Sequence, residues 1–165
     1  MALAVLLPIG PAGLLLRGGD APASPSASRL SKIAQDAGCR LTEFRDGMDT
    51  NPPVNGRFVE RISTADGSYA GKHPPSLLAT THALFHGRVL LQYRPGLPDT
   101  EVDALDRFVR RDTDRVLLFE NQTGMSAQVA ATAYLSVMTC PGVDRRTLQA
   151  LAAFRTRREA FGQSF

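Results

Sequence analysis

The stretch that decides the fold runs from residue 75 to residue 93 and reads Pro75-Ser76-Leu77-Leu78-Ala79-Thr80-Thr81-His82-Ala83-Leu84-Phe85-His86-Gly87-Arg88-Val89-Leu90-Leu91-Gln92-Tyr93. Its first half predicts a helix, because Ser76 is a favourable N-cap residue and Gly87 suits the position just after a helix C-terminus. Its second half, residues 88–93, is the most strand-like run in the chain. A helix followed directly by a buried strand therefore anchors the fold.

Two of the three histidines, His82 and His86, lie within this predicted helix. Residues four apart on a helix share one face, one turn apart. In an extended segment the same residues would lie about 13 Å apart, at about 3.3 Å per residue. Only the helix lets both imidazoles reach one metal ion. The alternative is one buried histidine bonded to the backbone and one exposed.

The rest of the chain predicts further helices at residues 29–39 and 100–111, and a last helix capped by Asp144. Gly38 would end the first of these, and Thr100 would cap the second. Residues 115–120 predict a strand, and the strand–helix–strand order suits a parallel crossover unit. Residues 128–138 predict another strand, with helix as the alternative. The result is a single α+β domain whose small mixed sheet is covered by helices on one face.

The N-terminal residues 1–28 have a different composition from the rest of the chain. Residues 2–16 are uniformly apolar but shorter than the roughly 20 residues of a membrane span, and a Pro/Ser-rich linker follows. The run is similar to the centre of a secretory signal with a cleavage site at Ala21-Pro22-Ala23, although no basic residue precedes Arg17. An apolar tail is the alternative. We expect export, with residues 29–165 as the folded domain and any membrane association only through residues 1–28.

The charge pattern argues against nucleic-acid binding. The formal net charge of the 165-residue chain is only +3. Arginines and aspartates alternate between residues 103 and 114, which is typical of a solvated helix face, whereas a nucleic-acid binder gathers basic residues on one surface. The expected partners are a metal ion or a small molecule, and the oligomeric state is left open.

A metal held by His82 and His86 would need further ligands, and His73, Met125 and Met48 are candidates. Met125 follows a turn-like Thr-Gly pair, where a large apolar side chain is unusual; the alternative is that it fills the core. Thioether and imidazole ligands together favour copper, particularly Cu(I), whereas carboxylates such as Asp49 or Glu120 would favour zinc or iron. We therefore expect copper, with zinc as the alternative.

Cysteine usage leaves two interpretations open. Cys39 and Cys140 are the only cysteines, and each lies beside turn residues. They suit a single bridge between the start of the domain and its last helix, but composition favours equally two unrelated buried thiols. A bridge would fit export, because disulfides persist outside the cytoplasm.

The order of several short motifs resembles a bacterial family of unknown function, domain-of-unknown-function family 3105. The motifs are Ala37-Gly38-Cys39, Asn51-Pro52-Pro53-Val54-Asn55-Gly56, Gly67-Ser68-Tyr69 and the run from His82 to Pro95. The resemblance covers about residues 33–156, and its most specific part is the His-x-Leu-x-His-Gly block with the strand after it. It implies an N-terminal export or membrane segment and a Cys39–Cys140 disulfide, but no established activity.

The chain departs from that family pattern at two positions. Where the family has a histidine after its Pro-Pro-x-x-Gly segment, this chain has Arg57 and Phe58. Where the family has a glutamate between the paired histidines, this chain has Phe85. If both lost residues belong to a metal site in the family, the site here is reduced or rebuilt around His82 and His86.

Three functional hypotheses follow. The first is an exported metal-binding domain using His82 and His86. The second is an enzyme that modifies a small molecule at the same site, with the turn-rich residues 47–70 as one wall and Arg57 or Tyr69 orienting the substrate. The third is a non-catalytic structural or interaction domain, in which the histidine-containing helix only packs on the sheet.

Overall fold

A computed structural model describes residues 26–45 and 50–161. The helices are α1 (Ala27–Asp36), α2 (Leu77–Phe85), α3 (Asp99–Arg110) and α4 (Arg145–Phe161). The strands are β1 (Arg40–Glu43), β2 (Gly67–Ser68), β3 (Val89–Tyr93), β4 (Val116–Glu120), β5 (Val129–Ala133) and β6 (Ser136–Cys140). Among these residues, every helix is too short or too polar to cross a membrane. The predicted signal-like segment, residues 1–23, lies outside the described residues.

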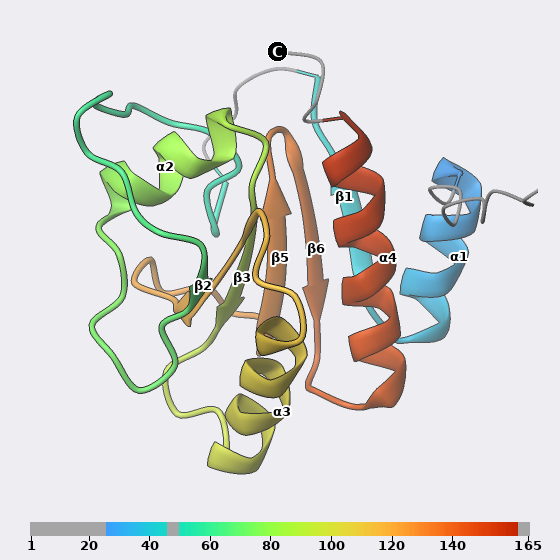
Figure 1. The fold of residues 1–165 in the computed structure, drawn as a ribbon. Coiled ribbons are helices and arrows are strands. Elements are labelled where there is room, and N and C mark those ends of the chain that lie inside the picture. Colours follow the sequence, from blue (N-terminus) through green and yellow to red (C-terminus); the bar gives the residue numbers. More distant parts are fainter. Residues whose placement is uncertain (1–25, 46–49, 162–165) are drawn as a thin grey trace, which may run out of the picture.

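The strands form one mixed sheet in the order β1-β6-β5-β3-β4-β2 (Figure 1). Strands β3 and β4 are parallel and joined by α3, which confirms the predicted crossover unit. Strand β2 is also parallel to β4, whereas β5 and β6 pair antiparallel with their neighbours. The predicted single α+β domain with a mixed sheet is confirmed.

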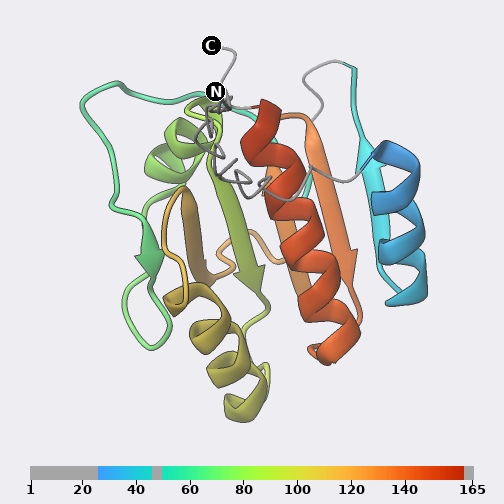
Figure 2. The same cartoon turned by 45° about the vertical axis from the view of Figure 1, so that its right-hand side comes forward.

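Helices cover both faces of the sheet, not one. Apolar residues of α1, α3 and α4 form one core with Val89, Leu91 and Leu118 of the sheet. Leu84 of α2 packs in a second core with Leu90 and neighbouring strand residues. Successive strand residues point to opposite faces, so a strand that is apolar at every position must be covered twice. Helices α1, α3 and α4 lie on one face, as expected, but α2 covers the opposite face. Figure 2 shows α4 lying in front of the strands.

The ends of α2 follow the sequence signals. The Ser76 hydroxyl accepts a hydrogen bond from the Ala79 N–H at 3.3 Å, which makes Ser76 the N-cap. At the other end Gly87 has φ 67°, and the Arg88 N–H donates to the Ala83 carbonyl at 3.0 Å. This is the glycine-dependent arrangement in which a helix ends and the chain turns sharply into the next element. It directs the chain from α2 into β3.

Two sequence predictions of local structure are wrong. Residues 128–138 form no single strand but most of the β5–β6 hairpin, which turns at Tyr134 and Leu135. Leu135 has φ 56°, a conformation that hairpin turns usually give to Gly or Asn, so the turn carried no recognisable signal. The second wrong prediction is Thr100 as the N-cap of α3. The helix begins after Pro98, and Thr100 lies inside it.

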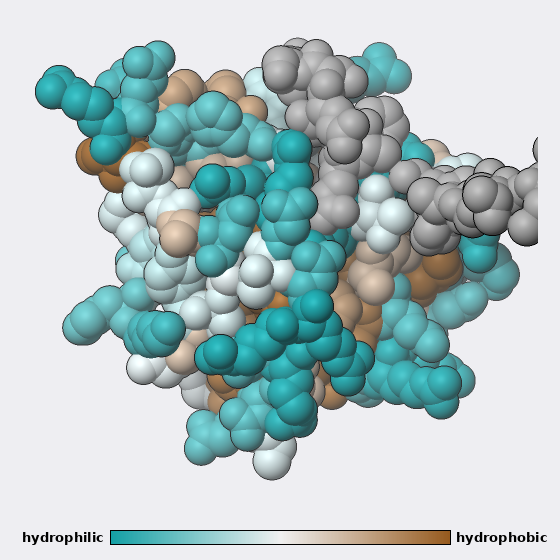
Figure 3. Space-filling view, viewed as in Figure 1, coloured by the Kyte–Doolittle hydropathy of each residue, from teal (hydrophilic) through white to brown (hydrophobic). Residues whose placement is uncertain are grey.

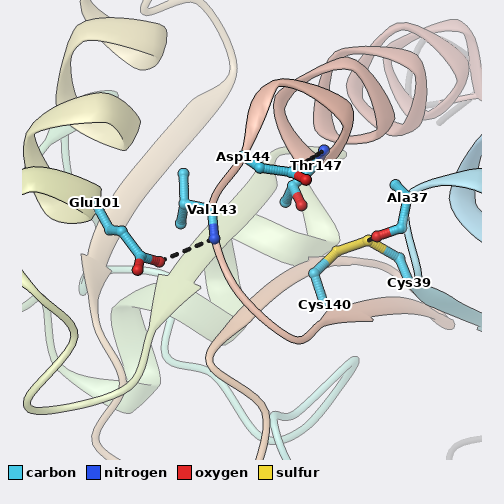
Figure 4. Close-up of a disulfide and its surroundings, with 7 residues drawn as sticks. All are labelled: Ala37, Cys39, Glu101, Cys140, Val143, Asp144 and Thr147. Carbon is cyan, nitrogen blue, oxygen red and sulfur yellow. Dashed lines mark hydrogen bonds between the residues drawn. A yellow bond between two sulfur atoms is a disulfide. The ribbon is translucent and has the colours of Figure 1, made fainter.

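The predicted disulfide is present between Cys39 and Cys140 (Figure 4). Helix α1 ends at Asp36, and Gly38, just beyond the C-cap, has φ 69°. The Cys39 N–H donates to the Ala34 carbonyl at 2.8 Å. The chain then enters β1, whose Arg40 pairs with Thr139 of β6. The two cysteines are thus the next pair along two adjacent strands, and the bridge joins the α1–β1 unit to the end of β6.

Candidate functional site

His82 and His86 face each other at the C-terminal end of α2. Their Nε2 atoms lie 2.9 Å apart and their ring centroids 4.6 Å apart. His82 is 8% exposed, whereas His86 is exposed at the helix C-cap. The helical arrangement predicted for the pair is therefore present, and it brings two imidazole nitrogens together at one point.

The backbone selects the tautomer of His82. The Nδ1 atom of His82 lies 2.9 Å from the Ile62 carbonyl oxygen. A carbonyl oxygen only accepts hydrogen bonds, so Nδ1 carries a proton and, in the neutral ring, Nε2 presents its lone pair. The proton between the two rings then belongs to Nε2 of His86. No feature of the sequence indicates this contact with His82, because Ile62 makes it through its backbone carbonyl and not through its apolar side chain.

A small pocket opens beside the pair. Its volume is about 170 Å³, and its walls are the inner side of α2, Ser63, Thr64 and Arg88. The Arg88 guanidinium pairs with Asp66 at 3.1 Å and donates to the Thr64 carbonyl at 2.6 Å. The carboxylate offsets the positive charge that Arg88 brings to the pocket.

The loop that carries Ile62 is held against α2 by specific contacts. The Thr81 hydroxyl lies 2.8 Å from the Arg57 carbonyl oxygen, to which it can donate. Gly56 approaches α2 so closely that a Cβ atom there would lie 3.1 Å from Thr81 Cγ2, and its φ of 152° favours glycine. These contacts place the segment after Gly56 directly over His82.

Three exposed aromatic rings form a connected row that begins on His82. Phe58 stacks on His82 with centroids 5.0 Å apart and planes only 6° from parallel. Phe58 also contacts Phe85, and Phe85 contacts Tyr134 in the β5–β6 turn. Val59, Leu77 and Leu78 are the other exposed large apolar residues of the described chain, so all six belong to α2, the loop over it and that turn. Figure 3 shows brown side chains over α2 at the upper left of the molecule.

The other predicted ligands do not join the pair. His73 is exposed and Met125 is buried at 2% exposure, and neither lines the pocket. Glu120 is the last residue of β4, and Met125 follows beyond it. His86 instead precedes the first residue of β3, which is parallel to β4, so it lies toward the opposite end of the strands. Met48 and Asp49 fall outside the described residues. Within residues 26–45 and 50–161, no group of three His, Cys, Asp or Glu side chains is arranged to hold a metal ion.

The residues proposed to orient a substrate are also placed elsewhere. The Tyr69 hydroxyl lies 2.6 Å from the Thr64 hydroxyl and donates to the Ala65 carbonyl at 2.8 Å, so it ties its own loop together. The side chain of Arg57 is exposed and does not line the pocket. The enzymatic hypothesis stays a prediction without support from these two side chains.

Comparison with known proteins identifies a family. A family model described as "Protein of unknown function (DUF3105)" matches residues 47–163. No curated protein and no solved structure matches the chain. The matched region contains α2, the loop over it and every strand except β1, and it covers well over half of the 165 residues. The chain therefore belongs to the DUF3105 family of proteins of unknown function.

Proposed function

We propose that this protein is an extracytoplasmic domain that binds a transition-metal ion, with copper preferred, through the Nε2 atoms of His82 and His86. The observation that carries the proposal is the hydrogen bond between His82 Nδ1 and the Ile62 carbonyl. Histidines that bind metals generally donate their second N–H to such an acceptor, which fixes the ring and its tautomer. The other nitrogen of His82 is thereby presented to a ligand.

The spacing of the two nitrogens supports the same proposal. Two imidazole nitrogens on a tetrahedral metal, each about 2.0–2.1 Å from it, are about 3.3 Å apart. The Nε2 atoms here are 2.9 Å apart, so a displacement of a few tenths of an ångström and loss of the shared proton would admit an ion. His86 is exposed and is therefore the ring with room to move.

Copper is preferred on general grounds of affinity. Divalent copper binds a given set of nitrogen ligands more tightly than other first-row metals, including zinc. The thioether argument for Cu(I) is not part of this proposal, because Met125 does not line the pocket. Two protein ligands leave coordination positions open to water or to another molecule, which suits a site that exchanges its metal.

The extracytoplasmic location is supported by the disulfide. Cys39 and Cys140 are joined, and such bonds persist mainly in oxidising compartments. The location and the metal site are compatible, because a site in the cell envelope or outside the cell meets metal ions away from the thiols of the cytoplasm.

Metal content after loading tests the proposed function. Wild-type protein, the His82→Ala/His86→Ala double variant and the His73→Ala variant are each incubated with Cu²⁺, desalted and measured by elemental analysis. We expect one ion per chain in the wild type and in His73→Ala, and none in the double variant. Equal copper in all three proteins would exclude the histidine pair as the site.

An interaction domain is the second candidate, and the exposed aromatic rings favour it. Phe58, Phe85 and Tyr134 form a connected apolar surface beside the pair. Patches of this kind often mark contact sites. A thermal melt that neither Cu²⁺, Zn²⁺ nor a chelator shifts would favour this candidate over metal binding, because a ligand that binds only the native state raises its stability.

A further inference from the structure

The exposed large apolar side chains of the described chain are concentrated on α2 and the segments beside it. Their exposed fractions are 36–49%, and we call them the α2 surface: Phe58, Val59, Leu77, Leu78, Phe85 and Tyr134. Leu78, His82 and Phe85 lie on one face of α2, because their spacing is i, i+4 and i+7. Phe58 covers His82 and contacts Phe85, which in turn contacts Tyr134. Figure 3 shows hydrophilic side chains bordering the brown ones at the upper left.

The area of the α2 surface is too small for a stable contact with a second copy of the chain. A fully exposed large side chain has about 150–250 Å² of surface, so the six exposed fractions amount to about 450 Å². Stable protein interfaces bury about 800 Å² on each partner. A lipid bilayer requires less area, because a few apolar side chains can enter its headgroup region without a matching surface.

The charges within the α2 surface favour an anionic partner. The loop over α2 reads Arg57-Phe58-Val59-Glu60-Arg61, and all five residues are exposed. Within the described chain, neither arginine of this loop forms an ion pair. Helix α2 contains no acidic residue. Arginine side chains lay their apolar stems on a surface while their charge reaches outward, and basic residues beside a membrane are attracted to anionic lipid.

The α2 surface lies at the end of the sheet where the described domain begins. The β5–β6 turn and the start of β3 meet at this end, because β5 and β3 are antiparallel neighbours, and α2 leads directly into β3. Helix α1 also begins toward this end, as Figure 1 shows. It runs back along β1, whose last residue pairs with the first residue of β6.

The chain that precedes α1 is long enough to connect this end of the sheet to a bilayer. Residues 2–16 are uniformly apolar, and residues 17–25 between them and the domain can span at most about 30 Å, at about 3.3 Å per residue. Three strand spacings, about 14 Å in total, separate β1 from β3. A bilayer contact by residues 2–16 would therefore leave the α2 surface within reach of the same lipid.

We propose that the α2 surface docks on a bilayer that contains anionic lipid. The side chains of Phe58 and Val59 enter the headgroup region, and those of Arg57 and Arg61 reach the lipid phosphates. This contact is additional to the one expected through residues 1–28, and two linked contacts hold more strongly than either alone. It names a partner for the exposed rings and does not depend on metal binding by the histidine pair.

A single tryptophan tests insertion, because the chain contains none. Val59→Trp carries it on the α2 surface. Gln149→Trp carries it at an exposed position near the start of α4, which follows the last residue of β6 and so lies toward the opposite end of the sheet. The 165-residue chain is mixed with vesicles of phosphatidylcholine, with or without an equal part of phosphatidylglycerol, in the presence of a chelator. With the anionic vesicles, emission from Val59→Trp should shift to shorter wavelength and be quenched by brominated lipid, whereas emission from Gln149→Trp should not change.

Sedimentation with the anionic vesicles measures the contribution of charge. Arg57→Gln/Arg61→Gln should weaken binding by at least about tenfold relative to the wild type. The control Arg145→Gln/Arg146→Gln removes the same charge from exposed positions at the start of α4 and should match the wild type. Residues 2–16 are present in every protein, so the differences report the α2 surface.

Two results would overturn the proposal. One is emission from Val59→Trp that the anionic vesicles do not shift, and the other is equal binding of the wild type and Arg57→Gln/Arg61→Gln. Self-association of the wild type that Val59→Asp abolishes would instead assign the α2 surface to a second copy of the chain. Copper content is measured separately, so failure of the membrane proposal leaves the metal proposal standing, and the reverse also holds.

Discussion

The rings of Phe58 and Phe85 meet directly beside the histidine pair, with centroids 4.4 Å apart. These are the two positions at which the sequence departs from the family pattern that it resembles, and they are 27 residues apart in the chain. Phe58 additionally stacks on His82. Two changes that look unrelated in sequence thus occupy one place in the structure, beside the histidine pair that we propose to bind a metal ion.

Replacing both rings with ligand-forming side chains should strengthen metal binding. Phe58→His places an imidazole where a ring already stacks on His82, and Phe85→Glu places a carboxylate next to it. Three or four nitrogen and oxygen ligands suit zinc. We expect the double variant to bind Zn²⁺ at least about tenfold more tightly than the wild type, measured by competition with a chromophoric chelator.

The control for this gain is the same double variant with His82→Ala and His86→Ala added. It should lose the gain, because the new side chains alone cannot complete the site. Zinc affinity that is unchanged by Phe58→His and Phe85→Glu would show that these positions do not face the nitrogen atoms of the pair.

The two histidines should contribute unequally to stability when no metal is bound. His82→Ala removes the hydrogen bond to the Ile62 carbonyl and the stacking partner of Phe58, which we expect to lower the free energy of unfolding by about 1–3 kcal/mol. His86→Ala affects an exposed ring and should cost less than about 1 kcal/mol. Urea unfolding in the presence of a chelator measures both. Equal losses would mean that the Ile62 contact does not anchor the loop.

The sequence predicted the elements whose signals are local. Gly38 and Gly87 mark helix ends because only a residue without a side chain readily adopts their positive φ. Asp144 caps α4, as expected, and its carboxylate accepts from the Thr147 N–H at 2.7 Å. The helical spacing of His82 and His86 followed from the same local rules.

Features that depend on distant contacts were not predictable. Strands β1 and β2 are short and take their structure from pairing with β6 and β4. A second pocket, which Tyr93 and Glu120 help to line, forms only because β3 and β4 are neighbours, and no motif connects those residues in the sequence. The contact between Phe58 and His82 likewise depends on how the loop folds back over α2.

Acid should destabilise the protein partly through Asp144. The hydrogen bond from the Thr147 backbone N–H is the largest effect, and it lowers the pKa of Asp144 below its usual value. A carboxylate whose pKa is lower when folded stabilises the protein above its unfolded pKa, and this contribution is lost as pH falls through the folded value. The loss should therefore lie below about pH 4.

Asp144→Asn isolates this effect, because asparagine also caps helices but does not titrate. We expect the urea midpoint of the wild type to fall more steeply below about pH 4 than that of the variant. The variant should keep part of the acid sensitivity, because the Asp114 backbone N–H lowers the pKa of Asp112 in both proteins. Parallel curves for the two proteins would show that the cap does not carry the acid response.

Loss of the disulfide should destabilise the whole domain. The bridge spans 101 residues, and constraining a loop of that length in the unfolded chain is worth about 4–5 kcal/mol in the loop-entropy model. Cys39 and Cys140 are both buried in the main core, where α1 packs against α4. We expect Cys39→Ser/Cys140→Ser to lower the free energy of unfolding by about that amount, measured in urea without reductant.

The matched control uses a reductant. Reduced wild-type protein should unfold at the same urea concentration as the double variant, because both lack the same constraint on the unfolded chain. If the reduced wild type were as stable as the oxidised protein, the packing of α1 on α4 would suffice to hold the first helix and β1 in place. The disulfide would then contribute little to holding the α1–β1 unit on the sheet.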